Sequence, residues 1–198
     1  MNSNNAKVFA SSDHHYFHRN IIKYCDRPFD FDDPNCVADN AKMMLARHNA
    51  TISNDDYWLC LGDLSAGLKG RQAELAKLIG IMNGRKILVR GNHDHEPNQF
   101  YLDAGFIAVV DYIHIDEYFI NHYPCVINEY SKPRDHERRG IVDSSGAKVI
   151  LHGHTHNKPP QHCEKYLRVN YAVDYKPNNF FPKEIRVPKI IRYINSNF

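Results

Sequence analysis

Five short apolar segments of this chain each run into polar residues that can bind a metal ion or move a proton. In order along the chain, those residues are Asp13 with His15, Asp63, Asn92 with His93 and Asp94, His122, and His154 with His156. Short apolar runs bounded by glycines and polar residues are typical of buried strands. Because binding sites in open α/β sheets form beyond the carboxyl ends of the strands, we expect these residues to converge in space.

The spacing of apolar residues between these segments predicts two amphipathic helices. Apolar residues recur every three or four positions over residues 36–49 and again from Ala73 to Met82. The expected strands are Lys7–Ser11, Tyr57–Leu61, Lys86–Arg90, two within Asp111–His122, Lys148–Leu151 and Leu167–Val173. Strands that alternate with helices and then follow one another indicate an α/β layered fold with a mixed sheet.

A single domain over residues 1–198 is the expected organisation. A chain of this length with 42% hydrophobic residues can bury a substantial core. The stretch 125–147 is polar and lies between two expected strands. Long loops in compact domains are usually functional or mobile, so we expect a loop insertion near the active site there.

Charge and cysteine content narrow the class of protein. The net charge of +2 is too balanced to indicate a surface for nucleic acid or membrane. No stretch approaches the roughly 18 apolar residues of a membrane span, and the start of the chain lacks the layout of a signal peptide. The five cysteines are widely scattered, which fits free thiols in a reducing compartment. We therefore expect a cytoplasmic protein without a membrane partner.

The polar residues at the strand ends share a ligand chemistry. Carboxylate, imidazole and amide donors suit Mn, Fe, Zn or similar ions rather than copper(I). Six or seven donors are too many for one four-coordinate zinc ion and suit two metal ions that share a carboxylate. Two-metal sites, with ions about 3.5–4 Å apart, serve in-line displacement at phosphorus. The donor set therefore indicates phosphoester hydrolysis.

The order of the motifs resembles that of a known superfamily, the calcineurin-like metallophosphoesterases. The motifs stand here as Asp13-His14-His15, Gly62-Asp63, Gly91-Asn92-His93-Asp94, His122 and Gly153-His154-Thr155-His156. They span residues 13–156, which is most of the chain. The resemblance implies a four-layer αββα sandwich, in which two mixed β-sheets are flanked by helices.

The resemblance also implies a role for each motif residue. One metal ion would be held by Asp13, His15, Asp63 and His156, and a second by Asp63, Asn92, His122 and His154. Asp63 would bridge the two ions. His93 would contact the phosphate and protonate the leaving oxygen, and Asp94 would orient His93.

Three stretches are similar to a small bacterial and phage subgroup of phosphoesterases. They are Asp13–Phe29, His122–Pro124 and Asn170–Asp174. Within the first stretch, His18 and Arg27 are candidates to line the substrate pocket, and ordinary surface positions are the alternative. Protein phosphatases of the superfamily carry an arginine after the Gly-Asp motif, and this chain has Leu64-Ser65 there. We therefore expect no phosphoprotein substrate.

The expected function is hydrolysis of a phosphodiester or phosphomonoester of a small, nucleotide-type substrate, by in-line attack of a hydroxide that bridges two divalent metal ions. Manganese is the favoured metal, and Fe, Zn and Ni are the alternatives. A nuclease acting on DNA or RNA is the second hypothesis, although the chain lacks an added capping domain and a basic charge balance. A catalytically silent scaffold is the third, although every ligand and His93 are present. The natural substrate and the oligomeric state stay open.

Overall fold

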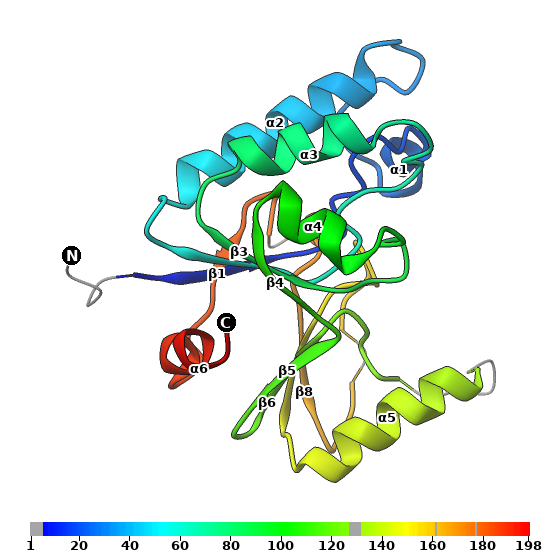
Figure 1. Cartoon of the computed structure of the whole chain (residues 1–198). Helices are drawn as coiled ribbons and strands as arrows, with labels where there is room; N and C mark the ends of the chain where they lie inside the picture. Colours follow the sequence, from blue (N-terminus) through cyan, green and yellow to red (C-terminus); the bar gives the residue numbers. More distant parts are fainter. Residues whose placement is uncertain (1–5, 127–131, 161, 177) are drawn as a thin grey trace.

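Two mixed β-sheets lie face to face in the computed structural model, which describes residues 6–126, 132–160, 162–176 and 178–198 (Figure 1). The first sheet has the order β4-β3-β2-β1-β9, comprising Phe106–Val110, Arg85–Val89, Tyr57–Cys60, Val8–Ser11 and Lys183–Glu184. The second has the order β5-β6-β7-β8, comprising Tyr112–Ile115, Tyr118–Asn121, Val149–His152 and Leu167–Asn170. Only the β1–β9 and β5–β6 pairs of these two sheets are antiparallel.

Helices cover the outer faces of both sheets. The helices are α1 (Asn20–Tyr24), α2 (Cys36–Thr51), α3 (Gln72–Ile81), α4 (Asn98–Ala104), α5 (Pro133–Ser145) and α6 (Ile190–Asn197). In Figure 1, α2 and α3 lie over the first sheet, and α5 lies beyond the second sheet at the bottom of the view. The layers are therefore helix, sheet, sheet and helix, which confirms the predicted αββα sandwich.

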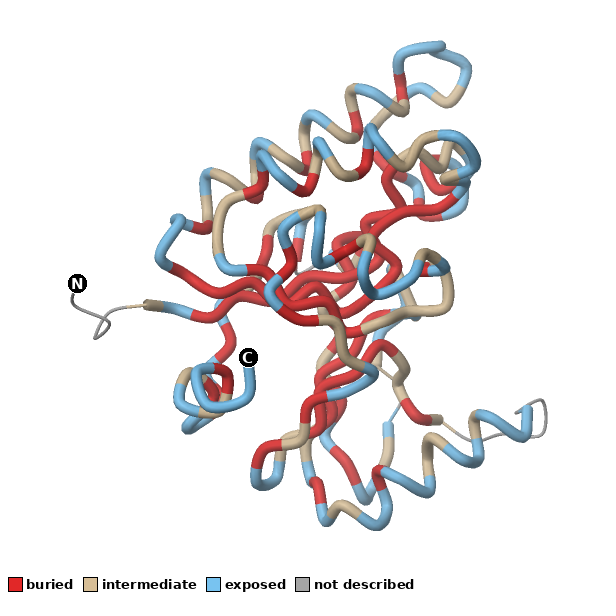
Figure 2. Tube along the Cα trace, in the orientation of Figure 1, coloured by how far each residue is buried: buried red, intermediate tan, exposed pale blue. Residues whose placement is uncertain are grey.

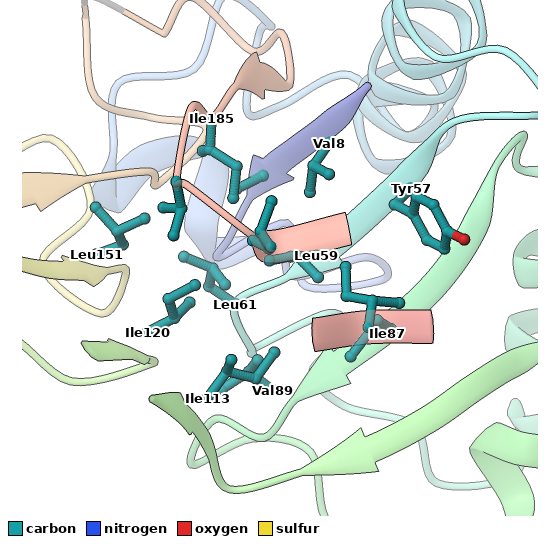
Figure 3. Packing of buried hydrophobic residues seen from close by; sticks show 14 of the residues in the cluster. Val8, Tyr57, Leu59, Leu61, Ile87, Val89, Ile113, Ile120, Leu151 and Ile185 are labelled. Carbon is teal, nitrogen blue, oxygen red and sulfur yellow. The ribbon is translucent and has the colours of Figure 1, made fainter. Parts of the chain in front are cut away.

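Side chains alternate along β2, so one face of the strand packs against the second sheet and the other packs against helices. Tyr57, Leu59 and Leu61 join the apolar cluster between the sheets, where they meet residues of β5–β7 (Figure 3). Trp58 and Cys60 point to the other face and pack with residues of α2 and α3. Because both faces of the first sheet are covered, residues 8–10, 57–60 and 87–89 of its strands are continuously apolar. They lie in the buried centre of the molecule (Figure 2).

The prediction of a loop over residues 125–147 was wrong for most of that stretch. Residues 133–145 form helix α5, and residues 127–131 lie outside the described part of the chain. Pro133 stands in the first turn, Asp135 accepts a hydrogen bond from the backbone N–H of Lys132, and Gly146 ends the helix at φ 76°. Val142 is its one buried residue, so the apolar spacing that usually reveals a helix is almost missing.

Two further expectations concern free thiols and membrane-spanning segments. All five cysteines are described, and none forms a disulfide. Across the described ranges, no helix combines the length and the apolar character that crossing a bilayer requires.

Truncation of a side chain between the two sheets should strongly destabilise the protein. Leu59 is fully buried, so Leu59→Ala should lower the free energy of unfolding by about 2–5 kcal/mol. Leu167→Ala is the matched control, because Leu167 is 64% exposed and surface changes cost about 0.5 kcal/mol or less. Chemical denaturation measures both, and equal losses in the two variants would contradict this description of the core.

Candidate metal centre

The carboxyl ends of β1, β2, β3, β6 and β7 bring the predicted ligands together. The centre of the group is Asp63, which follows β2. Its Oδ2 atom lies 3.5 Å from Nε2 of His15 and 3.4 Å from Nε2 of His122. The convergence expected from the strand ends is therefore present.

Two sets of donors meet at Asp63. In the first set, Asp13, His15 and His156 each place a ligand atom within 4.8 Å of the others. The Nε2 atom of His156 lies 3.8 Å from Oδ1 of Asp13. The first set thus comes from the ends of β1 and β7.

The second set includes Asp63 itself. Asp63, His122 and His154 form a group with the same 4.8 Å limit. Nε2 of His122 is 3.1 Å from Nδ1 of His154 and 3.2 Å from Oδ1 of Asn92. All seven predicted ligands are therefore placed in one or the other set.

The residues present fit divalent metal ions. His15 is 3% exposed, and neither of its ring nitrogens makes a hydrogen bond within the described chain. A buried imidazole that makes no hydrogen bond is costly unless something else occupies its lone pair. Asp13 and Asp63 are also buried, so their negative charge calls for nearby positive charge. Mixed carboxylate, imidazole and amide donors are those that Mn, Fe and Zn accept.

Two histidines of the site have raised pKa values, which favour their protonated, positively charged forms. Burial lowers the pKa of His122, but the carboxylates of Asp63 and Asp13 outweigh burial and raise it to about 9. Burial likewise lowers the pKa of His156, but the hydrogen bond to Asp174 and the nearby Cys25 and Asp13 outweigh burial and raise it to about 10. Burial raises the pKa of the Asp13 carboxyl. Metal ions would replace these protons, as metal binding to imidazole generally does.

The backbone at five of the predicted ligands is left-handed. Asp13 with His15, and His154 with His156, are two positions apart, a spacing at which side chains point the same way in an extended chain. Instead φ is 60° at Asp13, 48° at His15, 68° at His154 and 50° at His156, and it is 54° at Asp63. Such conformations are unfavourable for residues other than glycine, and they gather at functional sites.

Two glycines let the ligand loops approach one another. A Cβ atom at Gly91 would lie 2.6 Å from the backbone nitrogen of Asp63. A Cβ atom at Gly153 would collide with the Ser12 hydroxyl and the Asp13 carboxylate. Side chains at these two positions would therefore push the loops apart.

Asp94 joins the loops rather than contacting His93. Its Oδ2 atom accepts hydrogen bonds from the backbone N–H groups of Asp63 and Gly91, both at 2.8 Å, and Oδ1 accepts one from Leu64 at 3.1 Å. No hydrogen bond among the described residues joins the Asp94 carboxylate to the His93 ring. The geometry therefore places Asp94 behind Asp63 as a positioning residue, which differs from the orienting role that the resemblance implied.

His93 and His18 lie on the side of the first donor set. The ring centroid of His15 is 5.0 Å from that of His93 and 5.8 Å from that of His18. A third group of donors, His15, Asp63 and His93, also falls within the 4.8 Å limit. His93 is therefore close enough either to bind an ion or to act on a substrate beside it.

Arg27, the second substrate-binding candidate, is instead buried in an ion pair with Asp174. Its side chain is fully buried, and its Nε and Nη2 atoms donate to the two carboxylate oxygens of Asp174 at 2.7 Å and 3.0 Å. It also donates to the backbone carbonyls of Asp13 and His14. Arg27 thus supports the loop that carries the first ligands from behind.

Asp174 is a site residue that the sequence did not single out. Its Oδ2 atom lies 2.9 Å from Nδ1 of His156. Burial raises the pKa of Asp174, but His156 and Arg27 outweigh burial and lower it to about 2. A carboxylate on the second nitrogen of a ligating imidazole fixes the direction of the first nitrogen. The only sequence signal was the similarity of Asn170–Asp174 to the phosphoesterase subgroup.

Asp174→Asn should loosen this support. The change leaves the buried Arg27 guanidinium without a full countercharge, which typically costs about 3–5 kcal/mol. It also weakens the hold on His156, and such changes typically cost about 10–100-fold in metal affinity. Chemical denaturation and manganese titration measure the two effects. Asp116→Asn, in an exposed pair with Lys189, is the control, and native metal affinity in Asp174→Asn would refute the positioning role.

Comparison with known proteins gives relatives of low sequence identity. The uncharacterized protein MJ1445 of Methanocaldococcus jannaschii is 27% identical over 201 residues, which cover 96% of this chain and 97% of that protein. The Gene 66 protein of Mycobacterium phage D29 is 28% identical over 173 residues, which cover 77% of this chain and 80% of that protein.

The fold and the family follow from two further matches. The crystal structure of AQ665 from Aquifex aeolicus, a protein of unknown function, covers 98% of this chain and 100% of its own, with 23% identity and a TM-score of 0.69. That likeness shows a shared fold. The model of the calcineurin-like phosphoesterase superfamily domain matches residues 8–171. The chain therefore belongs to the calcineurin-like phosphoesterase superfamily.

Proposed function

We propose that this protein is a phosphoesterase with two metal ions that hydrolyses a small phosphodiester or phosphomonoester. The observation that carries the proposal is the position of Asp63, whose Oδ2 atom lies 3.5 Å and 3.4 Å from imidazoles of two separate donor sets. One carboxylate oxygen between two sets is the arrangement that a bridging ligand requires. Membership of the superfamily supports the reaction class.

The metal ions would be held by the two sets described above, with manganese as the favoured element. When bound, they would supply positive charge to the phosphate oxygens and acidify a water molecule, as two-metal sites do in phosphoester hydrolysis. The residues of the protein set the net charge of the site. Only Asp13 and Asp63 among the seven donors carry negative charge, and Asn92 is neutral, so a bound pair of divalent ions keeps surplus positive charge for an anionic substrate.

His93 is the proposed proton donor to the leaving oxygen. Its backbone N–H donates to Oδ1 of Asp63 at 2.8 Å, which fixes the residue beside the bridging carboxylate. Its ring is half-buried and adjoins His15, so a substrate between the two donor sets would have an imidazole at its edge. His18 beside it is the proposed second contact on this flank. Metal ligation by His93 is the competing role, and the metal content of a variant separates the two.

His93→Ala should slow hydrolysis without emptying the site. General-acid catalysis contributes typically about 10²–10⁴-fold, so we expect a loss of that order for methyl phenyl phosphate. The loss should be smaller for methyl p-nitrophenyl phosphate, because p-nitrophenolate leaves readily without a proton. Steady-state rates at matched, measured metal content test this.

His95→Ala is the matched control, since His95 is an exposed histidine two residues away. Wild-type rates on both esters in fully metallated His93→Ala would remove His93 from the proton-donor role. Loss of an ion from this variant would instead assign His93 as a ligand.

Asp63→Asn should reduce metal binding. The substitution keeps the shape of the side chain but removes the negative charge that the two donor sets share, so we expect fewer than two ions per chain by elemental analysis. Asp103→Asn, at an exposed position on α4, is the control. Two retained ions in purified Asp63→Asn would contradict the bridging role.

A further inference from the structure

A cleft opens between helix α5 and the β5–β6 hairpin. It has a volume of about 360 Å³, which is within the usual range of about 300–1,000 Å³ for small-molecule sites. Its walls combine three aromatic rings with three arginines, namely Tyr112, Phe119 and Tyr123 with Arg90, Arg134 and Arg138. None of the catalytic or metal-binding roles proposed above uses these six side chains.

The cleft adjoins the second donor set. Gly91, which immediately precedes the ligand Asn92, lines it, and so does Tyr123. The Tyr123 ring centroid is 4.8 Å from that of His122 and 5.1 Å from that of His154. His93 adjoins His15 in the first set instead. A substrate phosphate at Asp63 would therefore have the cleft on one flank and the proton donor on the other.

The side chains of the cleft suit a flat, polar group. Tyr112 stacks on Phe119 with ring centroids 4.9 Å apart, yet Tyr112 remains 45% exposed. The guanidinium of Arg138 lies 3.6 Å above the centre of the Tyr123 ring. Stacked aromatic rings and arginine planes are the surfaces on which nucleobases rest. Asp111 and Glu137 on the same walls can accept hydrogen bonds from the edge of a base.

We propose that this cleft binds the nucleoside of a nucleoside phosphodiester, the part that stays on the phosphate after hydrolysis. The inference rests on the proposed function and adds to it a substrate class and an orientation. The leaving group departs on the side of His93, because the proton donor must reach the leaving oxygen. The retained nucleoside then extends past Tyr123 toward Tyr112, along the walls of the cleft.

Two chromogenic diesters with the same leaving group test the proposal. Thymidine 5′-p-nitrophenyl phosphate and methyl p-nitrophenyl phosphate each react with water, which adds its hydroxyl to phosphorus and its proton to the medium as p-nitrophenolate leaves. They differ only in the retained group. Because stacking of a base on an aromatic side chain gives typically about ten-fold or more in binding, we expect kcat/KM for the thymidine ester to exceed that for the methyl ester by about ten-fold.

Two variants place that preference in the cleft. Tyr112→Ala removes a stacking surface, and Ile141→Trp fills the cleft from α5, where Ile141 is 39% exposed. Each should reduce the ratio of the two kcat/KM values toward one. Ile81→Trp is the matched control, because Ile81 is 51% exposed at the end of α3, and it should keep the wild-type ratio. Circular dichroism checks that each variant is folded.

The outcomes separate the two proposals. Hydrolysis of both esters by the wild-type protein at equal kcat/KM would overturn the nucleoside cleft and leave the phosphoesterase intact. An undiminished preference in folded Ile141→Trp would also overturn it. No hydrolysis of either diester, or of the monoester p-nitrophenyl phosphate, by fully metallated protein would contradict the phosphoesterase function itself, and the cleft proposal would fall with it. Hydrolysis of the monoester alone would keep the phosphoesterase function and overturn the cleft proposal.

Discussion

Two carboxylates buried at the ends of neighbouring parallel strands are the constraint on which the rest of the site depends. Asp13 and Asp63 are almost inaccessible to water, and a buried negative charge is costly without a compensating cation. Of the histidines around them, His122 and His156 have raised pKa values, whereas burial lowers the pKa values of His15 and His154. Divalent cations would therefore suit this buried pair of carboxylates.

The network that holds these carboxylates is made largely of backbone groups. The Asp13 carboxylate accepts hydrogen bonds from the backbone N–H of His154 and from the Ser12 hydroxyl. Asp94 ties the Asp63 loop to Gly91 in the same way. Each loop is therefore hydrogen-bonded to a neighbouring loop. These bonds between loops hold the predicted ligands in their left-handed backbone conformation.

Arg27 and Asp174 extend the network to the back of the site. They are 147 positions apart in the chain, and together they connect the first ligand loop to His156. A fully buried pair of this kind gives little net stability by itself, whereas loss of one partner is costly. We therefore expect the pair to fix the direction of the His156 ring more than the stability of the fold.

The apolar runs and the polar residues at their ends were enough to predict the strands that carry the candidate ligands and the convergence of seven donors. The four-layer fold followed only from the resemblance of the motif order to the superfamily. The sequence could not reveal α5, because only Val142 of that helix is buried and its spacing carries no apolar period. The elements α1, α4 and β9 span only five, seven and two residues, which is too short for a period to appear.

The sequence by itself determined which atoms can bind metal, because the donor types and their order at the strand ends are properties of the chain. Tertiary structure alone decided how those atoms are supported. Asp94 could equally have contacted His93, and Arg27 could equally have faced a substrate, since either role satisfies the same local sequence. The hydrogen-bond partners that they have in the structure, Asp63 for Asp94 and Asp174 for Arg27, come from loops far away in the chain. The pairing of β2 with β3 and the packing of the two sheets bring those loops together.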